Sequence, residues 1–251
     1  MAFGSAYIQG IKDSIDLLKL DLEKKFKGYT IMTTFTSKKV ISLLKERHNY
    51  YVPHISSTLF NLVNDGYKEV YLVPLHVIEG AQFKQLLKLK SEYEYSFDRI
   101  ELLKPLLSYK EEKVKEIYSI VEGLKGDMED GDILLVGHGS LKDSNDVYKN
   151  IKTEFDELLG KRFYMATLEG ENTFERTIKE IKENNVEHIT IKTLLIIPGK
   201  HYINDICEGE YSLVKRLENE GINVSISKSS LLQYEDIRKI YTDDIEARIT
   251  K

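Results

Sequence analysis

Apolar and polar residues alternate with two different periods along the chain, which predicts helices and strands in turn. In the first half, apolar positions such as Ile8, Ile11 and Ile15 recur at helical spacing. We expect helices near 6–26, 37–48, 56–66, 79–92 and 109–124, and strands near 29–35, 69–77 and 98–104. The second half repeats the scheme, with strands near 132–137, 162–168, 188–197 and 222–228 and helices near 144–159, 173–184, 204–220 and 234–248. Strands that alternate with helices are typical of parallel βαβ units, so the expected fold class is α/β with layered parallel sheets.

The chain is expected to divide in the middle. A charged stretch, Asp127-Met128-Glu129-Asp130-Gly131, separates the two runs of elements. The length of 251 residues also exceeds the usual size of one domain. We therefore expect two α/β domains, 1–126 and 127–251, each with a parallel sheet flanked by helices.

The two halves also read as copies of one another. Residues 64–83 align without gaps with residues 183–202, and Phe3-Gly4-Ser5 aligns with His138-Gly139-Ser140. In this pairing the first half has Phe3 where the second has His138. We expect two similar domains that face each other across a cleft.

Three residues that can bind metal follow strand-like runs in the second half. His138 follows an Ile-Leu-Leu-Val run, Glu169 follows a Phe-Tyr-Met-Ala-Thr-Leu run, and His201 follows a long apolar run and a Pro-Gly-Lys turn. The carboxyl ends of parallel strands meet at one edge of a sheet, so these side chains are expected to converge. Two imidazoles and a carboxylate are a ligand set for a borderline divalent metal ion. Gln82 takes the place of His201 in the first half, so one asymmetric site per chain is expected.

These residue types suit a site that transfers a metal ion. Three side chains leave coordination positions open, as in catalytic metal sites, so the ion can be released. A neutral imidazole can accept a proton near pH 7, which makes His138 and His201 candidates for both ligand and catalytic base. The negative charge of Glu169 offsets that of a dication. Intrinsic affinities rank nickel above cobalt, so affinity alone does not define the metal.

Composition argues against several other functions. The formal net charge of −5 gives no electrostatic reason to expect nucleic acid. No apolar run has the roughly 18 residues of a membrane span, and the N-terminus lacks a secretory pattern, so we expect no membrane and a cytoplasmic protein. Cys207 is the one cysteine, which excludes an intrachain disulfide and a cysteine-based zinc site. Three further histidines lie in polar settings and are expected to be solvated: His48, His54 and His188.

Four segments resemble the anaerobic sirohydrochlorin cobaltochelatases, the class II chelatases that work without ATP. They are Pro74-Leu75-His76-Val77-Ile78-Glu79-Gly80, Val136-Gly137-His138-Gly139-Ser140, Leu168-Glu169-Gly170 and Gly199-Lys200-His201-Tyr202-Ile203-Asn204-Asp205. The most specific element is Gly-His-Gly followed later by His-x-Ile-Asn-Asp. The resemblance extends from Phe3 to the last helix.

The resemblance implies a fold, a reaction and ligands. It implies two chelatase-like α/β domains with a tetrapyrrole-sized cleft, with His138, Glu169 and His201 as metal ligands and His138 as the proton acceptor. The implied substrates are sirohydrochlorin and a divalent metal, with Co²⁺ first and Ni²⁺ or Fe²⁺ as alternatives. No ATP and no organic cofactor are implied, and a homo-oligomer is implied by the resemblance alone.

The macrocycle is a flat apolar ring with a fringe of carboxylates, so its site needs apolar faces and nearby donors or cations. Candidates to contact the ring are Phe3, His76, Phe83 and Tyr202. The turns at Gly4-Ser5 and Gly139-Ser140 offer backbone N–H groups, and Lys142 and Lys200 offer cations. A core position for His76 is an equally good interpretation.

Two departures from the family pattern change the expectation. The family begins with a complete apolar strand before its Phe-Gly-[Ser/Thr] turn, whereas only Met1 and Ala2 precede Phe3 here. We expect either a much shortened first strand or a start that lies upstream, and a less stable first domain. The family also tends towards Gly-Tyr-Pro after the glutamate, where this chain has Gly170-Glu171-Asn172. This difference leaves the carboxylate in place but changes the adjacent wall.

Three functions remain open at this point. The favoured one is insertion of Co²⁺ into sirohydrochlorin on the anaerobic route to cobalamin. A second is a nickel or iron chelatase on the same macrocycle, and a third is a non-catalytic carrier of the metal or the tetrapyrrole. A hydrolase is disfavoured, because Ser140 lacks a Gly-x-Ser-x-Gly setting.

Overall fold

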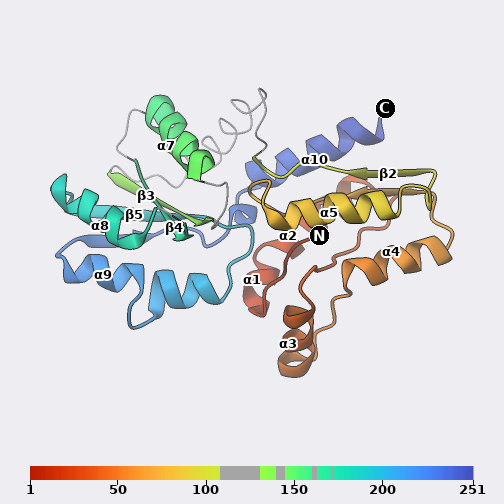
Figure 1. Cartoon of the computed structure of the whole chain (residues 1–251), viewed down its shortest axis with the longest axis horizontal. Helices are drawn as coiled ribbons and strands as arrows, with labels where there is room; N and C mark the ends of the chain where they lie inside the picture. Colours follow the sequence, from red (N-terminus) through yellow and green to blue (C-terminus); the bar gives the residue numbers. More distant parts are fainter. Residues whose placement is uncertain (108–130, 140–144, 160–162, 171, 251) are drawn as a thin grey trace.

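The computed structural model describes residues 1–107, 131–139, 145–159, 163–170 and 172–250. The first half of the chain contains α1 (Ile8–Lys12), α2 (Ile15–Lys25), α3 (Lys38–His48), α4 (Ile55–Asn64), β1 (Glu69–Leu72), α5 (Ala81–Glu92) and β2 (Arg99–Leu102). The second half contains β3 (Asp132–Gly139), α7 (Asn145–Leu159), β4 (Phe163–Glu169), α8 (Phe174–Glu183), β5 (His188–Leu194), the π-helix η1 (Tyr202–Glu208), α9 (Leu213–Asn219), β6 (Asn223–Ile226), the 3₁₀-helix η2 (Leu231–Gln233) and α10 (Glu235–Ile249). The two groups lie side by side in Figure 1, and their parallel strands confirm the expected α/β class. Within these described ranges, no helix is long and apolar enough to cross a membrane.

The second half is built on a four-stranded parallel sheet in the order β4-β3-β5-β6. Central strand β3 pairs Val136 with Ala166 of β4. Successive residues of a strand point to opposite faces, so Ile133 and Leu135 enter one core cluster while Leu134 and Val136 enter another. Residues of α7 pack on the first face and residues of α8 and α9 on the second. Burial on both faces accounts for the continuous apolar runs of these strands.

The first half contains a smaller, two-stranded parallel sheet of β1 and β2. The strand predicted near 29–35 is wrong, because residues 29–34 form no strand. Isolated parallel bridges join Phe35 to Ala2 and to His54. A strand needs hydrogen-bonded neighbours along its length, and among the described residues this segment has such a neighbour only at its end.

Two predicted helices are interrupted. The helix predicted near 6–26 is divided into α1 and α2, and the Ser14 hydroxyl between them donates to the Gly10 carbonyl. The helix predicted near 204–220 is η1 followed by α9, with Gly209 in the break. A Cβ on Gly209 would lie 2.0 Å from the Asn204 carbonyl oxygen, so the backbone there is too close for a larger residue. The helix predicted near 109–124 and the domain boundary at 126–127 lie outside the described residues.

Helix α10 packs on α2 of the first half. Arg238 of α10 donates to Asp21 of α2 at 2.5 Å. Ile237 and Tyr241 belong to the core cluster that also contains Leu18 of α2. The C-terminal helix is therefore shared with the first half, and the domain bounds stay a prediction.

Candidate functional site

The predicted ligands of β3 and β4 lie at the same edge of the larger sheet. His138 is the second-last residue of β3, and Glu169 is the last residue of β4. Gly139 pairs with Glu169 in the parallel register. The side chains of His138 and Glu169 are exposed. Ser140 and Lys142, which follow in the sequence, lie outside the described residues.

Close backbone packing holds the end of β3. Gly139 has a φ of +74°, and a Cβ there would lie 1.9 Å from the carbonyl oxygen of Glu169. Tyr148 of α7 fills the space beside Gly137, where a Cβ would lie 2.3 Å from its ring. The Tyr148 hydroxyl accepts a hydrogen bond from the Gly139 N–H at 3.2 Å, and burial raises the pKa of this tyrosine. The two glycines therefore let the residue between them, His138, sit directly against β4.

His201 lies at the start of η1, after the turn that leaves β5. Its Nδ1 is 2.6 Å from Oδ2 of Asp205. A carboxylate on one ring nitrogen fixes the orientation of the imidazole and leaves Nε2 for a metal ion. The role of Asp205 was not predicted, although the four-residue spacing from His201 at a helix start is the signal that points to it.

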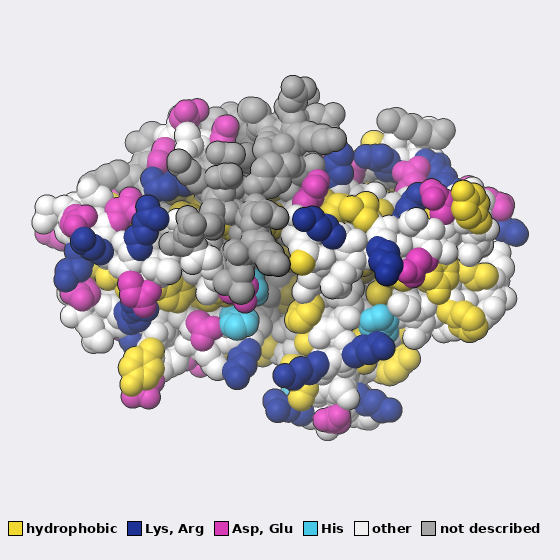
Figure 2. All heavy atoms as spheres, viewed as in Figure 1, with side chains coloured by type: hydrophobic (Ala, Val, Ile, Leu, Met, Phe, Trp, Pro, Cys, Tyr) yellow, Lys and Arg dark blue, Asp and Glu magenta, His cyan; other side chains and the backbone are white. Residues whose placement is uncertain are grey.

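The structure brings His138 and His201 together. Their ring centroids are 5.7 Å apart and the ring planes are inclined at 86°. Figure 2 shows histidine side chains near the middle of the molecular face, between the two halves. Among the residues that the structure describes, no group of three His, Cys, Asp or Glu side chains is placed to hold a metal ion. The part of Glu169 as a third ligand stays a prediction.

The first half supports the turn that precedes His201. The Ser5 hydroxyl donates to the Pro198 carbonyl at 3.0 Å. Gly10 lies so close to the same oxygen that a Cβ on it would be 2.6 Å away. Gly4 has a φ of +105° and packs on a buried aromatic ring. Ser5 is thus a buried contact between the halves, and contacts of Gly4 and Ser5 with a macrocycle stay predictions.

The other candidate substrate contacts differ in burial. Phe3 is 47% exposed, and Lys200 is exposed as well. Tyr202 is half-buried, and burial raises the pKa of its hydroxyl. Phe83 is only 6% exposed, so its side chain belongs to the core. Among the predicted contacts that the structure describes, Phe3 and Lys200 are therefore exposed.

His76 lies beyond the end of β1 and is half-buried. Both of its ring nitrogens and the side-chain oxygen of Gln82 are buried without a hydrogen bond to any described residue. Burial, together with the charge of the nearby Met1 amino group, lowers the pKa of His76 to about 4. The ring is therefore neutral at pH 7. Buried polar atoms without partners are uncommon in folded proteins, and they often mark functional positions.

Similar proteins were found by sequence and by structure. A sirohydrochlorin cobaltochelatase of Salmonella typhimurium is 21% identical over 213 residues, which cover 84% of this chain and 79% of that protein. The structure of SirB from Bacillus subtilis with Fe³⁺ aligns with a TM-score of 0.64 and 17% identity, over 98% of this chain and 92% of that one. The sirohydrochlorin chelatase SirB from Bacillus subtilis subspecies spizizenii in complex with cobalt aligns with a TM-score of 0.62 and 14% identity, over 98% and 91% of the two chains.

The structural likenesses show that the fold is the two-domain chelatase fold. The sequence match to a protein family also extends over nearly the whole chain. The family described as "Cobalt chelatase (CbiK)" matches residues 1–250, which is nearly the whole chain. The chain belongs to the cobalt chelatase family.

Proposed function

We propose that this protein inserts Co²⁺ into sirohydrochlorin without ATP, with the ion bound by His138, His201 and Glu169. The observation that carries the proposal is the 5.7 Å separation of the two imidazole rings. A nitrogen of each ring binds such an ion at about 2.0–2.1 Å, so two rings that share one ion have centroids roughly 5–6 Å apart. The separation of the two rings is therefore compatible with one shared ion.

The two imidazoles have different partners, which supports different roles. His201 has the carboxylate of Asp205 on Nδ1, which strengthens Nε2 as a ligand. His138 Nδ1 lies 3.4 Å from the carbonyl oxygen of Gly139, which is a weaker partner than a carboxylate. His138 is therefore the ring better suited to exchange the metal ion for a proton. Metal insertion releases two pyrrole protons, and His138 is proposed to accept one of them.

Glu169 is proposed to complete the ligand set. Its backbone lies beside Gly139, the neighbour of His138, and its side chain is exposed. A carboxylate lowers the net charge of the bound dication and leaves open positions for the incoming macrocycle nitrogens. A three-ligand set of this kind holds the ion without enclosing it.

The carboxylates of the macrocycle require local cations, because the net charge of the protein is −5. Lys200 is exposed beside His201. Figure 2 shows Lys and Arg side chains gathered over α3, on the same face as the histidines. This helix carries Lys38, Lys39, Lys45 and Arg47. We propose that these cations attract the acidic fringe of sirohydrochlorin.

Cobalt is proposed as the metal because the family and the curated relative are both cobalt chelatases. The ligand types also accept Ni²⁺ and Fe²⁺. The physiological metal therefore has to be assigned from rates of insertion, since affinity for the free ion ranks nickel above cobalt for any such ligand set.

The test is an anaerobic absorbance assay of sirohydrochlorin with Co²⁺, Ni²⁺ and Fe²⁺ in turn. We expect the protein to metallate many equivalents of macrocycle, with the largest acceleration for Co²⁺ over the reaction without protein. Faster insertion of Ni²⁺ or Fe²⁺ would reassign the metal. A single equivalent of product, or release of unmetallated macrocycle, would indicate a carrier and contradict the enzymatic proposal.

A further inference from the structure

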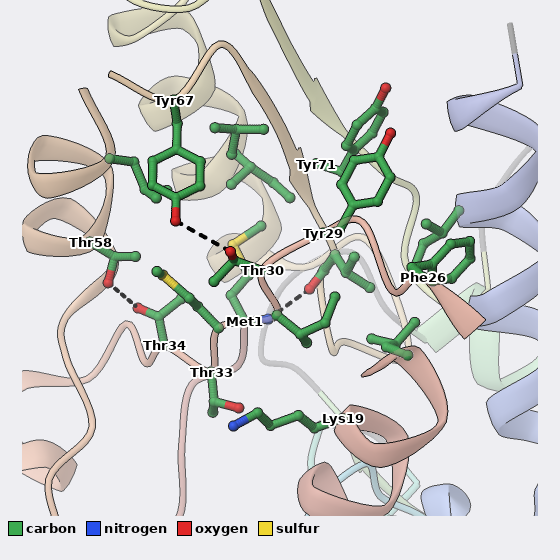
Figure 3. Close-up of a pocket in the computed structure, with 18 of the residues that line it drawn as sticks. Met1, Lys19, Phe26, Tyr29, Thr30, Thr33, Thr34, Thr58, Tyr67 and Tyr71 are labelled. Atoms are coloured by element: carbon green, nitrogen blue, oxygen red, sulfur yellow. Dashed lines mark hydrogen bonds between the residues drawn. The ribbon is translucent and has the colours of Figure 1, made fainter. Parts of the chain in front are cut away.

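The histidine pair receives no support from the cavity that lies in the first half. That cavity has a volume of about 590 Å³, and Lys19, Tyr29 and Tyr71 lie around it in Figure 3. Its lining, among the residues that the structure describes, includes none of the predicted metal ligands or macrocycle contacts. The support of the pair lies instead in the packing beneath the end of β3.

His138 stands on a strand end that is flexible by composition. Gly137 and Gly139 flank it, and glycine has more conformational freedom than any other residue. The pairing of β5 with β3 ends at Gly137, and beyond that residue β3 pairs with β4 at Gly139 and Glu169. The sheet therefore holds His138 from one side only. The position of its imidazole depends on contacts from outside the sheet.

Tyr148 of α7 makes such contacts on both sides of His138. Its ring fills the space beside Gly137, where a Cβ would lie 2.3 Å from Cε1 of the tyrosine. Its hydroxyl accepts the hydrogen bond from the Gly139 N–H at 3.2 Å. The Tyr148 side chain is 2% exposed and belongs to the same core cluster as Leu135 of β3. A ring packed in this way has little freedom, so it holds both glycines in place.

The hydroxyl of Tyr148 is not needed for packing alone. A phenylalanine would fill the same space without a polar group, whose burial costs free energy unless it is hydrogen-bonded. The first half offers a comparison, because it has Phe3 where the second half has His138. There the ring packed against Gly4, the counterpart of Gly139, belongs to Phe35 and carries no hydroxyl. The buried hydroxyl thus accompanies the half that carries the histidine.

We propose that Tyr148 is a positioning residue for His138, which holds the imidazole where it can share an ion with His201. The inference rests on the proposed function, since it takes His138 as a ligand of Co²⁺. The Tyr148 ring fixes Gly137, and the hydroxyl fixes Gly139 against the Glu169 carbonyl. A ligand that is already held in place loses less conformational entropy when the ion binds, so the affinity for the ion is higher.

The first test is Tyr148→Phe in the full chain, which removes the hydroxyl and keeps the ring. We expect the affinity for Co²⁺ alone, measured by calorimetric titration, to fall by about 10-fold, the lower end of the effect of groups that orient metal ligands. Tyr241→Phe removes another buried hydroxyl, from α10, and is the matched control. The control should keep the Co²⁺ affinity of the unmodified protein. An unchanged affinity in Tyr148→Phe would overturn the proposal.

A background without the imidazole separates positioning from a general loosening of the strand end. In His138→Ala the proposed ligands His201 and Glu169 remain, so a weaker Co²⁺ affinity can still be titrated. If Tyr148 acts through His138, adding Tyr148→Phe should change the affinity of this background by less than about 2-fold. A merely structural role would lower the affinity by the same factor in both backgrounds, and that result would overturn the proposal.

Hydrogen exchange at the Gly139 amide provides a measurement that needs no metal ion. We expect slow exchange in the unmodified protein and exchange faster by about 5-fold or more in Tyr148→Phe, because one hydrogen bond is lost. Rapid exchange of this amide in the unmodified protein would overturn the proposal even if the variant did not fold. Failure of the proposed function looks different. In that case His138→Ala itself would leave the Co²⁺ affinity unchanged, and both inferences would fall together.

Discussion

At the residue scale, the candidate site consists of two imidazoles with unequal support. His201 is fixed by the carboxylate of Asp205 at 2.6 Å, while His138 stands in a glycine-flanked strand end against Tyr148. The unequal partners support the proposed roles, with His201 as the ligand that stays in place and His138 as the group that exchanges a proton. Each role makes a different prediction for substitution.

Replacing His138 by Ala should lower the rate of cobalt insertion by about 100-fold or more, because a positioned base contributes at least that factor. The side chain is exposed, so the free energy of unfolding should change by less than about 0.5 kcal/mol. Anaerobic absorbance kinetics and thermal unfolding measure the two effects. His48→Ala, at an exposed position of α3, is the matched control and should keep full activity. Undiminished turnover of the His138 variant would remove this residue from the mechanism.

Replacing Glu169 by Gln keeps the shape of the side chain and removes its charge. We expect the affinity for Co²⁺ to fall by about 10-fold or more, since a charged ligand is lost, while the affinity for sirohydrochlorin changes little. Separate calorimetric titrations with Co²⁺ and with the macrocycle distinguish these effects. An unchanged affinity for Co²⁺ would show that Glu169 is not a ligand.

His76 makes a prediction about pH. Its folded pKa of about 4 lies below the unfolded value near 6.5, so the unfolded chain binds more protons between these values. Stability should therefore fall as the pH is lowered from about 6.5 to 4. Leu195 occupies the corresponding position in the second half, so His76→Leu is a natural replacement. Denaturant unfolding measures the free energy of unfolding at pH 7 and at pH 5. Between these pH values this free energy should fall by about 1–2 kcal/mol less in the variant than in the unmodified protein. An identical pH dependence would contradict the assignment.

The sequence predicts the histidine pair because the carboxyl ends of parallel strands share an edge. The sequence does not predict where side chains point. Glu169 was expected to converge with the pair, but the described residues contain no three-residue group of this kind. The burial of side chains in the segments that follow strands is also hard to predict from the sequence. Phe83 is only 6% exposed, and its contact with a macrocycle stays a prediction.

At the element scale, β3 and β4 set the geometry of the site through their register. Gly139 opposes Glu169, and its positive φ lets the two backbones come together. The close approach positions the neighbouring His138 relative to β4. A change at this glycine should therefore affect both stability and the site.

Gly139→Ala should destabilise the fold by about 2–4 kcal/mol, because its Cβ would clash with the Glu169 carbonyl and its φ of +74° is strained for alanine. Gly28→Ala is the matched control, since no atom lies within 4 Å of its Cβ, and it should change stability by less than about 0.5 kcal/mol. Denaturant unfolding compares the two. Similar stability for both variants would mean that the β3–β4 contact is less tight than the structure indicates.

Strand prediction succeeds where a segment has partners and fails where it does not. The sequence of 29–35 has the composition of a strand, and its counterpart Phe163–Glu169 is one. In the first half only the end of this segment meets a neighbour, at Ala2 and Phe35. Pairing is a property of two segments, so propensity in one of them cannot establish it. The breaks at Ser14 and Gly209 escape prediction for a similar reason, since the apolar period continues across them.

At the scale of the whole molecule, the halves are joined by α10, which the sequence assigns to the second half but which packs on α2 of the first. The ion pair between Arg238 and Asp21 is largely buried at the arginine, whose side chain is 14% exposed. The guanidinium also donates to the Leu232 carbonyl at 3.0 Å. The Arg238 side chain therefore links α10 to α2 and to η2.

Arg238→Gln should lower the free energy of unfolding by about 1–3 kcal/mol, because it leaves Asp21 and a carbonyl with a weaker partner. Lys239→Gln breaks an ion pair on the exposed side of the same helix, where the lysine is 67% exposed, and should cost less than about 0.5 kcal/mol. Chemical denaturation measures both. Equal losses of the free energy of unfolding in the two variants would show that the Arg238 contact does not stabilise the packing of the two halves.

The hydrogen bond from Ser5 to the Pro198 carbonyl has a consequence for how such a molecule works. His138 stands on the central strand of one half, whereas the turn leading to His201 is tied to the other half through this bond. Any hinge bending between the halves would therefore move His201 relative to His138. Under the proposed function, such bending would couple the separation of the two imidazoles to the separation of the halves, so the proposed metal site would weaken as the halves move apart.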